Sequence, residues 1–260
     1  MIHATAIVDP AARIGAGVAI GAYSVIGADV EIGDGTTIGP HVVVSGTTRI
    51  GRDNRIFQFA SIGADPQDKK YGGEKSELVI GDRNVIREFT TLNRGTGEGG
   101  GATRIGNDNW IMAYVHVAHD CVVGNHTIFS NNATLAGHVT IGDYAILSGF
   151  AGVHQFCRIG AHAMLSATAK LVQDLPPFFI ADGTPAVIRA FNKVGLERRG
   201  YTPEQLERVK QIYRVLYRDG LNRSQALEKL RVHASANSAE FRLMLAFAEK
   251  SERGIAPGGT

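Results

Sequence analysis

The chain has 260 residues, of which 44% are hydrophobic, so it can bury a large core. Its first ten residues lack a basic n-region and no apolar run is long enough to span a membrane, so a soluble, cytoplasmic enzyme is expected. The net charge of +2 hides a basic C-terminal part, because residues 186–260 carry 14 Lys and Arg against 8 Asp and Glu. This excess suits an acidic protein partner or phosphate groups, and no basic face with interleaved aromatic residues indicates nucleic-acid binding.

A large apolar residue recurs at every sixth position through most of the chain. The series is Ile2, Val8, Ile14, Ile20, Ile26, Ile32, Ile38, Val44, Ile50, Ile56 and Ile62, then Ile80, Ile86 and Leu92, then every sixth residue from Ile105 to Leu171. The residue two places earlier is usually small, so each hexapeptide offers one large and one small side chain to a shared interior. Glycine often follows the large residue, and a sharp corner with unusual dihedral angles is the expected reason.

The hexapeptide pattern resembles the left-handed parallel β-helix, in which three hexapeptides form one coil of 18 residues. It predicts an all-β solenoid plus α, with a β-helix over residues 1–185 and a C-terminal α-helical domain over residues 186–260. The handedness follows from the resemblance alone, since the usual crossover is right-handed. Cys121 and Cys157 would lie two coils apart, about 9.6 Å, which exceeds the roughly 7 Å limit for a disulfide and predicts two free, buried thiols.

Two insertions interrupt the hexads, over residues 64–77 and residues 93–103. Insertions in a solenoid form loops on its faces, and such loops are often functional. The second insertion is rich in glycine and could cradle a phosphate, although it lacks the following Lys-Ser/Thr and an opening helix. After Leu171 the hexads stop, and Asp174-Leu175-Pro176-Pro177 is expected to end the ladder because paired prolines cannot join a central strand.

Helical signals follow in the basic part. Thr202 as N-cap, Pro203 at the first helical position and Gln205 three residues after the cap predict a helix that ends near Gly220. Two more amphipathic stretches fit residues 224–233 and 238–253. These helices are expected to cover one end of the coil.

Histidine is concentrated where the hexads are most regular. Five of the nine histidines lie between residues 116 and 154: His116, His119, His126, His138 and His154. With 18 residues per coil, His119, His138 and His154 are expected on one edge of adjacent coils. Three hypotheses fit them: zinc binding as in hexapeptide proteins of the carbonic anhydrase type, a surface ladder on a noncatalytic scaffold, or acyl transfer to a hydroxyl by a histidine general base. Loop insertions beside clustered histidines favour the transferase.

Six segments carry a more specific resemblance. They are Gln58–Gly63, Gln67–Tyr71, His116–Cys121, Asn131–His138, Val153–Phe156 and Gly195–Gly200. In this order, and over essentially the whole chain, the sequence resembles the family of acyl carrier protein-dependent UDP-N-acetylglucosamine O-acyltransferases that begin lipid A biosynthesis. The resemblance implies transfer of a 3-hydroxyacyl chain to the 3-hydroxyl of UDP-N-acetylglucosamine.

The resemblance assigns roles by position. His119 would be the general base that takes the proton of the acceptor hydroxyl, and the backbone N–H of Gly137 would be the oxyanion donor. Asp120 would orient His119, which neighbouring residues can do only near a corner; a turn carboxylate is the alternative. The residues implied to contact or flank the substrate are Asp68, Lys70, His116, His138, His154, Gln155, Asn192, Arg198 and Arg199. For the two arginines, which would meet the pyrophosphate, ordinary charge on a helix surface stays an alternative.

The resemblance also implies partners. A homotrimer with sites between subunits is expected, so that Lys70 and His119 could come from different chains, and the basic C-terminal part could dock an acidic acyl carrier protein. Because the thioester drives the transfer, no metal or nucleotide cofactor is expected.

Two positions depart from the family pattern. Val194 stands where an acid is common, and Ala167 stands at a position that acts as a ruler for the acyl chain, where glycine goes with longer chains. A medium-length 3-hydroxyacyl chain is therefore expected. The sister N-acyltransferase of the same pathway is an alternative, but it carries an N-terminal uridine-binding domain for which hexads starting at residue 2 leave no room. Open points are the exact acyl length, a 3-amino or 3-hydroxyl acceptor, the effect of Val194, and which arginine contacts which phosphate.

Overall fold

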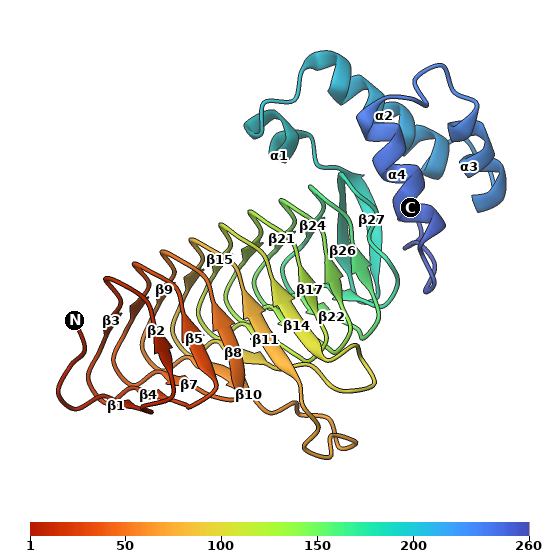
Figure 1. Cartoon of the computed structure of the whole chain (residues 1–260). Coiled ribbons are helices and arrows are strands. Elements are labelled where there is room, and N and C mark those ends of the chain that lie inside the picture. Colours follow the sequence, from red (N-terminus) through yellow and green to blue (C-terminus); the bar gives the residue numbers. More distant parts are fainter. Residues whose placement is uncertain (260) are drawn as a thin grey trace.

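The strands of the protein lie in three sheets, and the chain visits the sheets in turn as it winds along one axis (Figure 1). This computed structural model describes residues 1–259. Sheet 1 holds β1 (Ile7–Val8), β4 (Val25–Ile26), β7 (Val43–Val44), β10 (Ser61–Ala64), β13 (Thr91–Asn93), β16 (His116–Val117), β19 (Thr134–Leu135), β22 (Gly152–Val153) and β25 (Lys170–Leu171).

The other two sheets follow the same order along the axis. Sheet 2 holds β2 (Arg13–Ile14), β5 (Val30–Ile32), β8 (Thr47–Ile50), β11 (Glu77–Ile80), β14 (Ala102–Ile105), β17 (Val122–Val123), β20 (Thr140–Ile141) and β23 (Arg158–Ile159). Sheet 3 holds β3 (Ala19–Ile20), β6 (Thr37–Ile38), β9 (Arg55–Ile56), β12 (Val85–Ile86), β15 (Trp110–Ile111), β18 (Ile128–Phe129), β21 (Ile146–Leu147), β24 (Met164–Leu165), β26 (Phe179–Gly183) and β27 (Ala186–Phe191). We name the three edges by the sheets they join: edge 1–2, edge 2–3 and edge 3–1.

The register confirms the predicted coil of 18 residues wherever no insertion intervenes. Ile7 pairs with Val25 in parallel, and His116 pairs with Thr134. The large hexad residues from Ile20 to Leu171 are buried in one core, whereas Ile2 at the open end of the solenoid is 49% exposed. Cys121 and Cys157 are free and buried, as expected.

The glycines after the large residues are explained by close packing, not by unusual dihedral angles as expected. Except at Gly63, their φ values are not positive; the left-handed position usually comes two residues later, at residues such as Tyr23 and Tyr144. At Gly142 a Cβ would lie 2.5 Å from the backbone nitrogen of Ala161 in the next coil. Glycine is therefore needed here because successive corners touch.

Both insertions leave the solenoid at edge 1–2. One connects β10 to β11 and the other connects β13 to β14, so each runs from sheet 1 to sheet 2. They project as neighbouring loops beside the coils (Figure 1).

The ladder does not end at the paired prolines. Leu175 still pairs with Ile159, and β26 continues sheet 3 in parallel before β27 folds back antiparallel to it. The prolines are tolerated because they lie in the bend between these pairings, where no strand hydrogen bond is required of them. The predicted boundary between residues 185 and 186 consequently falls inside the hairpin of β26 and β27.

Four helices follow at one end of the solenoid (Figure 1). They are α1 (Lys193–Arg198), α2 (Pro203–Tyr217), α3 (Arg223–Arg231) and α4 (Ala239–Glu249). The capping box of Thr202 and Gln205 is present at the start of α2, as predicted, whereas α1 was not predicted. Within residues 1–259, no helix has both the length and the apolar character needed to cross a membrane.

Candidate active site

His119 and Asp120 lie at edge 1–2, in the turn that follows β16. The next coil places Gly137 and His138 in the equivalent turn after β19, and the backbone N–H of His138 donates to the carbonyl oxygen of His119 at 3.0 Å. The 18-residue period therefore brings these four residues together.

The side chains of His119 and Asp120 form a hydrogen-bonded pair. His119 Nδ1 lies 2.8 Å from Asp120 Oδ2, and the Asp120 side chain is fully buried. The left-handed backbone of Asp120, with φ of 59°, lets two neighbouring side chains meet, which a regular strand would prevent. Since an ionised carboxylate only accepts hydrogen bonds, the proton lies on Nδ1 and the lone pair of Nε2 remains available.

Gly137 lies directly against the imidazole of His119. A Cβ at this position would come within 2.5 Å of His119 Cε1 and 2.7 Å of Nε2. Among residues 1–259 the backbone N–H of Gly137 has no hydrogen-bond acceptor. A free donor next to an imidazole is the arrangement that an oxyanion site requires.

His138 completes the cluster. Its ring meets His119 edge-on, with centroids 5.1 Å apart, and stacks on Phe156 of the following coil at 4.5 Å. Burial lowers the pKa of His138, although the carboxylate of Asp120 acts in the opposite direction. His154 lies on the same edge, directly after β22, but it is Phe156 and not His154 that stacks on His138.

Two threonines that the sequence analysis missed hold Asp120. Thr96 donates to Asp120 Oδ1 through its backbone N–H at 2.9 Å and to Oδ2 through its hydroxyl at 2.7 Å. The backbone N–H of Asp120 donates to the hydroxyl of Thr103 at 2.8 Å. Thr96 belongs to the glycine-rich insertion, so this loop holds the carboxylate of Asp120. The glycine run was the only signal in the sequence.

Asp68 and Lys70 lie on the first insertion, at the same edge as His119. They line a hollow together with Tyr71, Glu74 and Thr96. The carboxylate of Asp68 also acts to raise the pKa of His138, which reflects its proximity to that ring. Lys70 and His119 therefore lie on one edge of one chain.

Three further predicted residues lie close by. His116, in β16, has its Nδ1 2.7 Å from the hydroxyl oxygen of Thr91, and burial lowers the pKa of its ring. His154 Nδ1 donates to the carbonyl oxygen of Gln155 at 3.1 Å. Gln155 is exposed and immediately precedes Phe156. These residues extend the site from edge 1–2 across sheet 1.

The predicted nucleotide-side residues lie on a different edge. Asn192, Arg198 and Arg199 line a hollow at edge 2–3 with His162 and Tyr144, and the Arg199 guanidinium lies 4.5 Å from the Tyr144 ring centroid. The side chain of Asn192 donates to the carbonyl oxygen of His162 and accepts from the N–H of Gly195, so it caps α1. Within one chain, this group does not meet His119.

Ala167 lies on the third edge. It is exposed in the turn between β24 and β25, at edge 3–1. The same edge carries a stack of aromatic rings that runs from Tyr23 through His41, Phe59 and Phe89 to Tyr114, with centroids 4.8 to 5.2 Å apart. Tyr23 is 61% and Tyr114 54% exposed.

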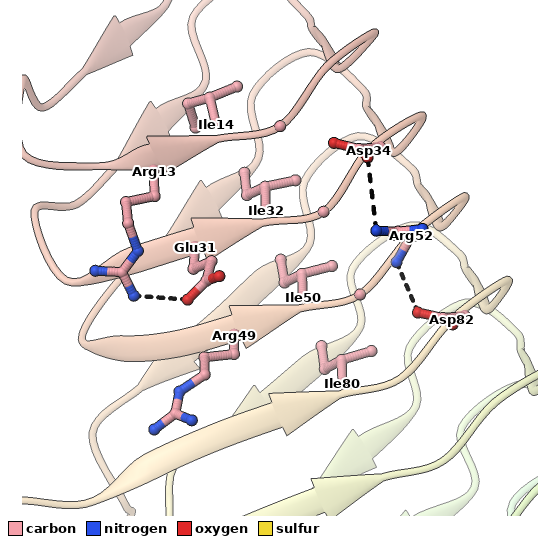
Figure 2. Close-up of a pocket in the computed structure, with 13 residues that line it drawn as sticks. Arg13, Ile14, Glu31, Ile32, Asp34, Arg49, Ile50, Arg52, Ile80 and Asp82 are labelled. Carbon is pink, nitrogen blue, oxygen red and sulfur yellow. Dashed lines mark hydrogen bonds and ion pairs between the residues drawn. The ribbon is translucent and has the colours of Figure 1, made fainter.

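A further hollow, on sheet 2 near the N-terminus, contains none of the predicted site residues (Figure 2). Its charges neutralise each other: Arg13 pairs with Glu31 at 2.6 Å, and Arg52 lies 3.9 Å from Asp34. These ion pairs connect adjacent coils, and the hollow has no net charge that would attract a ligand.

A metal ion is a chemical alternative for the histidine cluster. His119, Asp120 and His138 offer ligand atoms within 4.8 Å of one another, and no other such group occurs in residues 1–259. Both oxygens of Asp120 already accept hydrogen bonds from Thr96, however, so the carboxylate is satisfied without an ion.

The chain is similar to acyltransferases over its whole length. Residues 11–46 and 102–137 match the bacterial transferase hexapeptide family, and residues 174–256 match domain 2 of UDP N-acetylglucosamine O-acyltransferase. Two relatives are named acyl-[acyl-carrier-protein]–UDP-N-acetylglucosamine O-acyltransferase. The one from Herminiimonas arsenicoxydans is 55% identical, and the alignment covers 98% of each chain. The one from Stenotrophomonas maltophilia is 58% identical, and the alignment covers 97% of this chain and 96% of the relative.

Solved structures agree with these relatives. The UDP-N-acetylglucosamine acyltransferase of Francisella novicida is 42% identical with a TM-score of 0.97, covering 100% of this chain and 95% of that one. The Arabidopsis enzyme of the same name is 32% identical with a TM-score of 0.87, covering 98% of this chain and 100% of that one. The chain is thus an acyltransferase and belongs to the acyl-[acyl-carrier-protein]–UDP-N-acetylglucosamine O-acyltransferase family.

Proposed function

We propose that the protein transfers a 3-hydroxyacyl chain from acyl carrier protein to the 3-hydroxyl of UDP-N-acetylglucosamine, the first step of lipid A biosynthesis. The names of its relatives support the substrates. The observation that carries the mechanism is the His119–Asp120 hydrogen bond of 2.8 Å beside the free N–H of Gly137.

In the proposed reaction, His119 Nε2 takes the proton of the 3-hydroxyl as its oxygen attacks the thioester carbonyl carbon. The resulting oxyanion accepts a hydrogen bond from the N–H of Gly137, a contact typically worth about 3 kcal/mol. Collapse of the intermediate breaks the C–S bond, and the proton on His119 passes to the departing thiolate. Asp120 holds the imidazole with Nε2 free throughout.

We infer that the site is completed between subunits of a homotrimer. His119 lies at edge 1–2 and the arginines lie at edge 2–3, so one chain alone cannot bring both to one substrate. In such a trimer, sheet 1 of one chain would face sheet 3 of the next. Edge 1–2 of the first chain and edge 2–3 of the second would then lie together at the mouth of a cleft. The exposed aromatic stack of edge 3–1 would then be covered near the axis, which removes an apolar surface from water.

The same arrangement accounts for the remaining predicted residues. Asp68, Lys70, His138 and Gln155 would surround the sugar, and Arg198 and Arg199 of the neighbouring chain would meet the pyrophosphate near Asn192. The acyl chain would run inward across sheet 1, past His116 and His154. It would end near Ala167, whose methyl group would shorten the path and favour a medium-length chain.

Three further features are proposed together with this function: the handedness of the coil, the cellular compartment and the domain division. We infer a left-handed coil from the hexapeptide family match and a cytoplasmic enzyme from its substrates. We also infer two domains, with the division after β27, because β27 completes sheet 3.

The basic residues of the helical domain would dock the acidic carrier protein. The double charge reversal Arg214→Glu/Arg242→Glu should therefore weaken carrier-protein binding, and unchanged affinity would exclude this surface.

An acyl-transfer assay with UDP-N-acetylglucosamine and a series of 3-hydroxyacyl carrier proteins tests the proposal. His119→Ala should lower the rate at least 10²-fold, the usual minimum for a positioned general base. His3→Ala, at the exposed N-terminal end of the solenoid, is the matched control and should retain most activity. A loss of rate smaller than 10²-fold in His119→Ala would show that His119 is not the general base. Equal transfer rates with medium-length and the longest 3-hydroxyacyl chains would contradict the role of Ala167.

A further inference from the structure

The glycine-rich insertion contacts the buried carboxylate that orients His119. Asp120 is 6% exposed as a residue, and none of its side-chain surface is exposed. Its two oxygens accept from Thr96 N–H, Thr96 Oγ and His119 Nδ1. Two of these three hydrogen bonds come from Thr96, so Thr96 determines the position of the carboxylate as much as His119 does.

The sequence of the glycine-rich insertion allows the loop backbone to lie close to Asp120. A Cβ at Gly99 would collide with the carboxyl group of Asp120, so only glycine lets the loop backbone pass there. The N–H of Gly99 also donates to the hydroxyl oxygen of Thr96 at 3.2 Å, which leaves the hydroxyl hydrogen directed at Asp120. Thr96 itself is 5% exposed, so water does not replace its hydroxyl.

The other insertion supports the same loop. The N–H of Gly97 donates to Glu74 Oε1 at 3.0 Å, and Glu74 Oε2 accepts from Gly72. The segment with Asp68 and Lys70 is therefore connected to Thr96, and through it to Asp120.

We propose that Thr96 is a positioning residue for acyl transfer: its hydroxyl and N–H fix the Asp120 carboxylate, which in turn holds the His119 imidazole with Nε2 toward the acceptor hydroxyl. This inference rests on the proposed function. Thr96 acts only through Asp120 and His119, since no reacting group needs to touch it. Losing its hydroxyl should lower kcat and leave KM for the sugar nucleotide nearly unchanged.

The test compares acyl transfer by Thr96→Val, Thr96→Ser and the unchanged protein. Thr96→Val should lower kcat about 10- to 100-fold, as expected for the loss of a hydrogen bond to a charged group, with KM changed less than about twofold. Thr96→Ser keeps the hydroxyl and should restore most of the rate. Thr36→Val, which removes an equally buried hydroxyl far from the site, is the matched control and should leave kcat unchanged.

A double-mutant cycle separates positioning from general stabilisation. In an Asp120→Ala background, Thr96→Val should cause no further loss, because its target is already absent. A full additional loss there, or equal kcat in Thr96→Val and the unchanged protein, would overturn the proposal. If Thr96→Val does not fold, Thr96→Ala and Thr96→Ser, which differ mainly in the hydroxyl, give the comparison; equal rates would refute it. The rate of the unchanged protein tests the proposed function by itself, whereas the ratios test Thr96.

Discussion

Gly137 lies against the ring of His119, and this contact makes the absence of a side chain essential. Gly137→Ala would place a Cβ 2.5 Å from His119 Cε1 and displace the imidazole from its bond with Asp120. We expect kcat to fall about 10²-fold, in line with misplacement of a catalytic group, with little change in melting temperature. Gly27→Ala, whose Cβ would meet nothing closer than 3.5 Å, is the control in steady-state assays. Equal activity of the two variants would contradict the close approach.

His162 gives the fold a pH dependence. Burial and the positive charge of Arg199 lower the pKa of this ring from 6.5 to about 4, while Asp143 acts weakly in the opposite direction. The unfolded chain therefore binds a proton between about pH 6.5 and pH 4 that the folded protein does not bind. Stability from His162 is complete above pH 6.5 and is lost as the pH falls through this window.

His162→Phe should remove this contribution and keep the stacking on Tyr144 and Phe178. Thermal unfolding at pH 7 and pH 4.5 should show a smaller drop in melting temperature for the variant than for the unchanged protein. The partly buried His116 and His138, whose pKa values burial also lowers, add the same acid sensitivity to both proteins. An equal drop would mean that His162 is protonated with little cost.

At the scale of elements, buried asparagines fasten the turns of successive coils. The N–H of Asn84 donates to Asn54 Oδ1, and the N–H of Asn109 donates to Asn84 Oδ1, both at 2.9 Å. The amide of Asn84 also donates to the carbonyl oxygen of Gly106 at 3.0 Å. Each side chain thus replaces a strand bond at a corner, where the strands themselves have ended.

Asn84→Ala would leave a buried N–H and a buried carbonyl group without partners. The free energy of unfolding should fall by about 3 kcal/mol, within the usual cost of unsatisfied buried groups. Urea unfolding measures this, with Thr37→Ala on the exposed face of β6 as the control. A loss below that of the control would show that the asparagine ladder contributes little.

The hexad period was sufficient to predict the sheets, the register and the meeting of His119 with His138, because each coil repeats the geometry of the last. It could not predict Thr96 as a partner of Asp120, since the path of an insertion follows no repeat. It did not predict the hairpin of β26 and β27, because Pro176 and Pro177 are typical of the end of a ladder but here lie in a bend. Short α1 lacks enough residues for a helical period.

For the molecule as a whole, the sequence predicted candidate site residues but not how they are distributed over the edges of the solenoid. Hexad positions fix His119 at edge 1–2, whereas Arg198 and Arg199 follow the last coil, and only the folded end shows that they lie at edge 2–3. We propose that these two parts of the site meet across a cleft shared between neighbouring chains of a trimer.

Mixed trimers test this claim most directly. We would co-express His119→Ala with Arg198→Ala/Arg199→Ala, each nearly inactive alone, and verify mixed trimers by native mass spectrometry. If each site takes His119 from one chain and the arginines from its neighbour, equal mixing should restore about a quarter of the unchanged rate. Mixed trimers no more active than either parent would contradict a site shared between subunits.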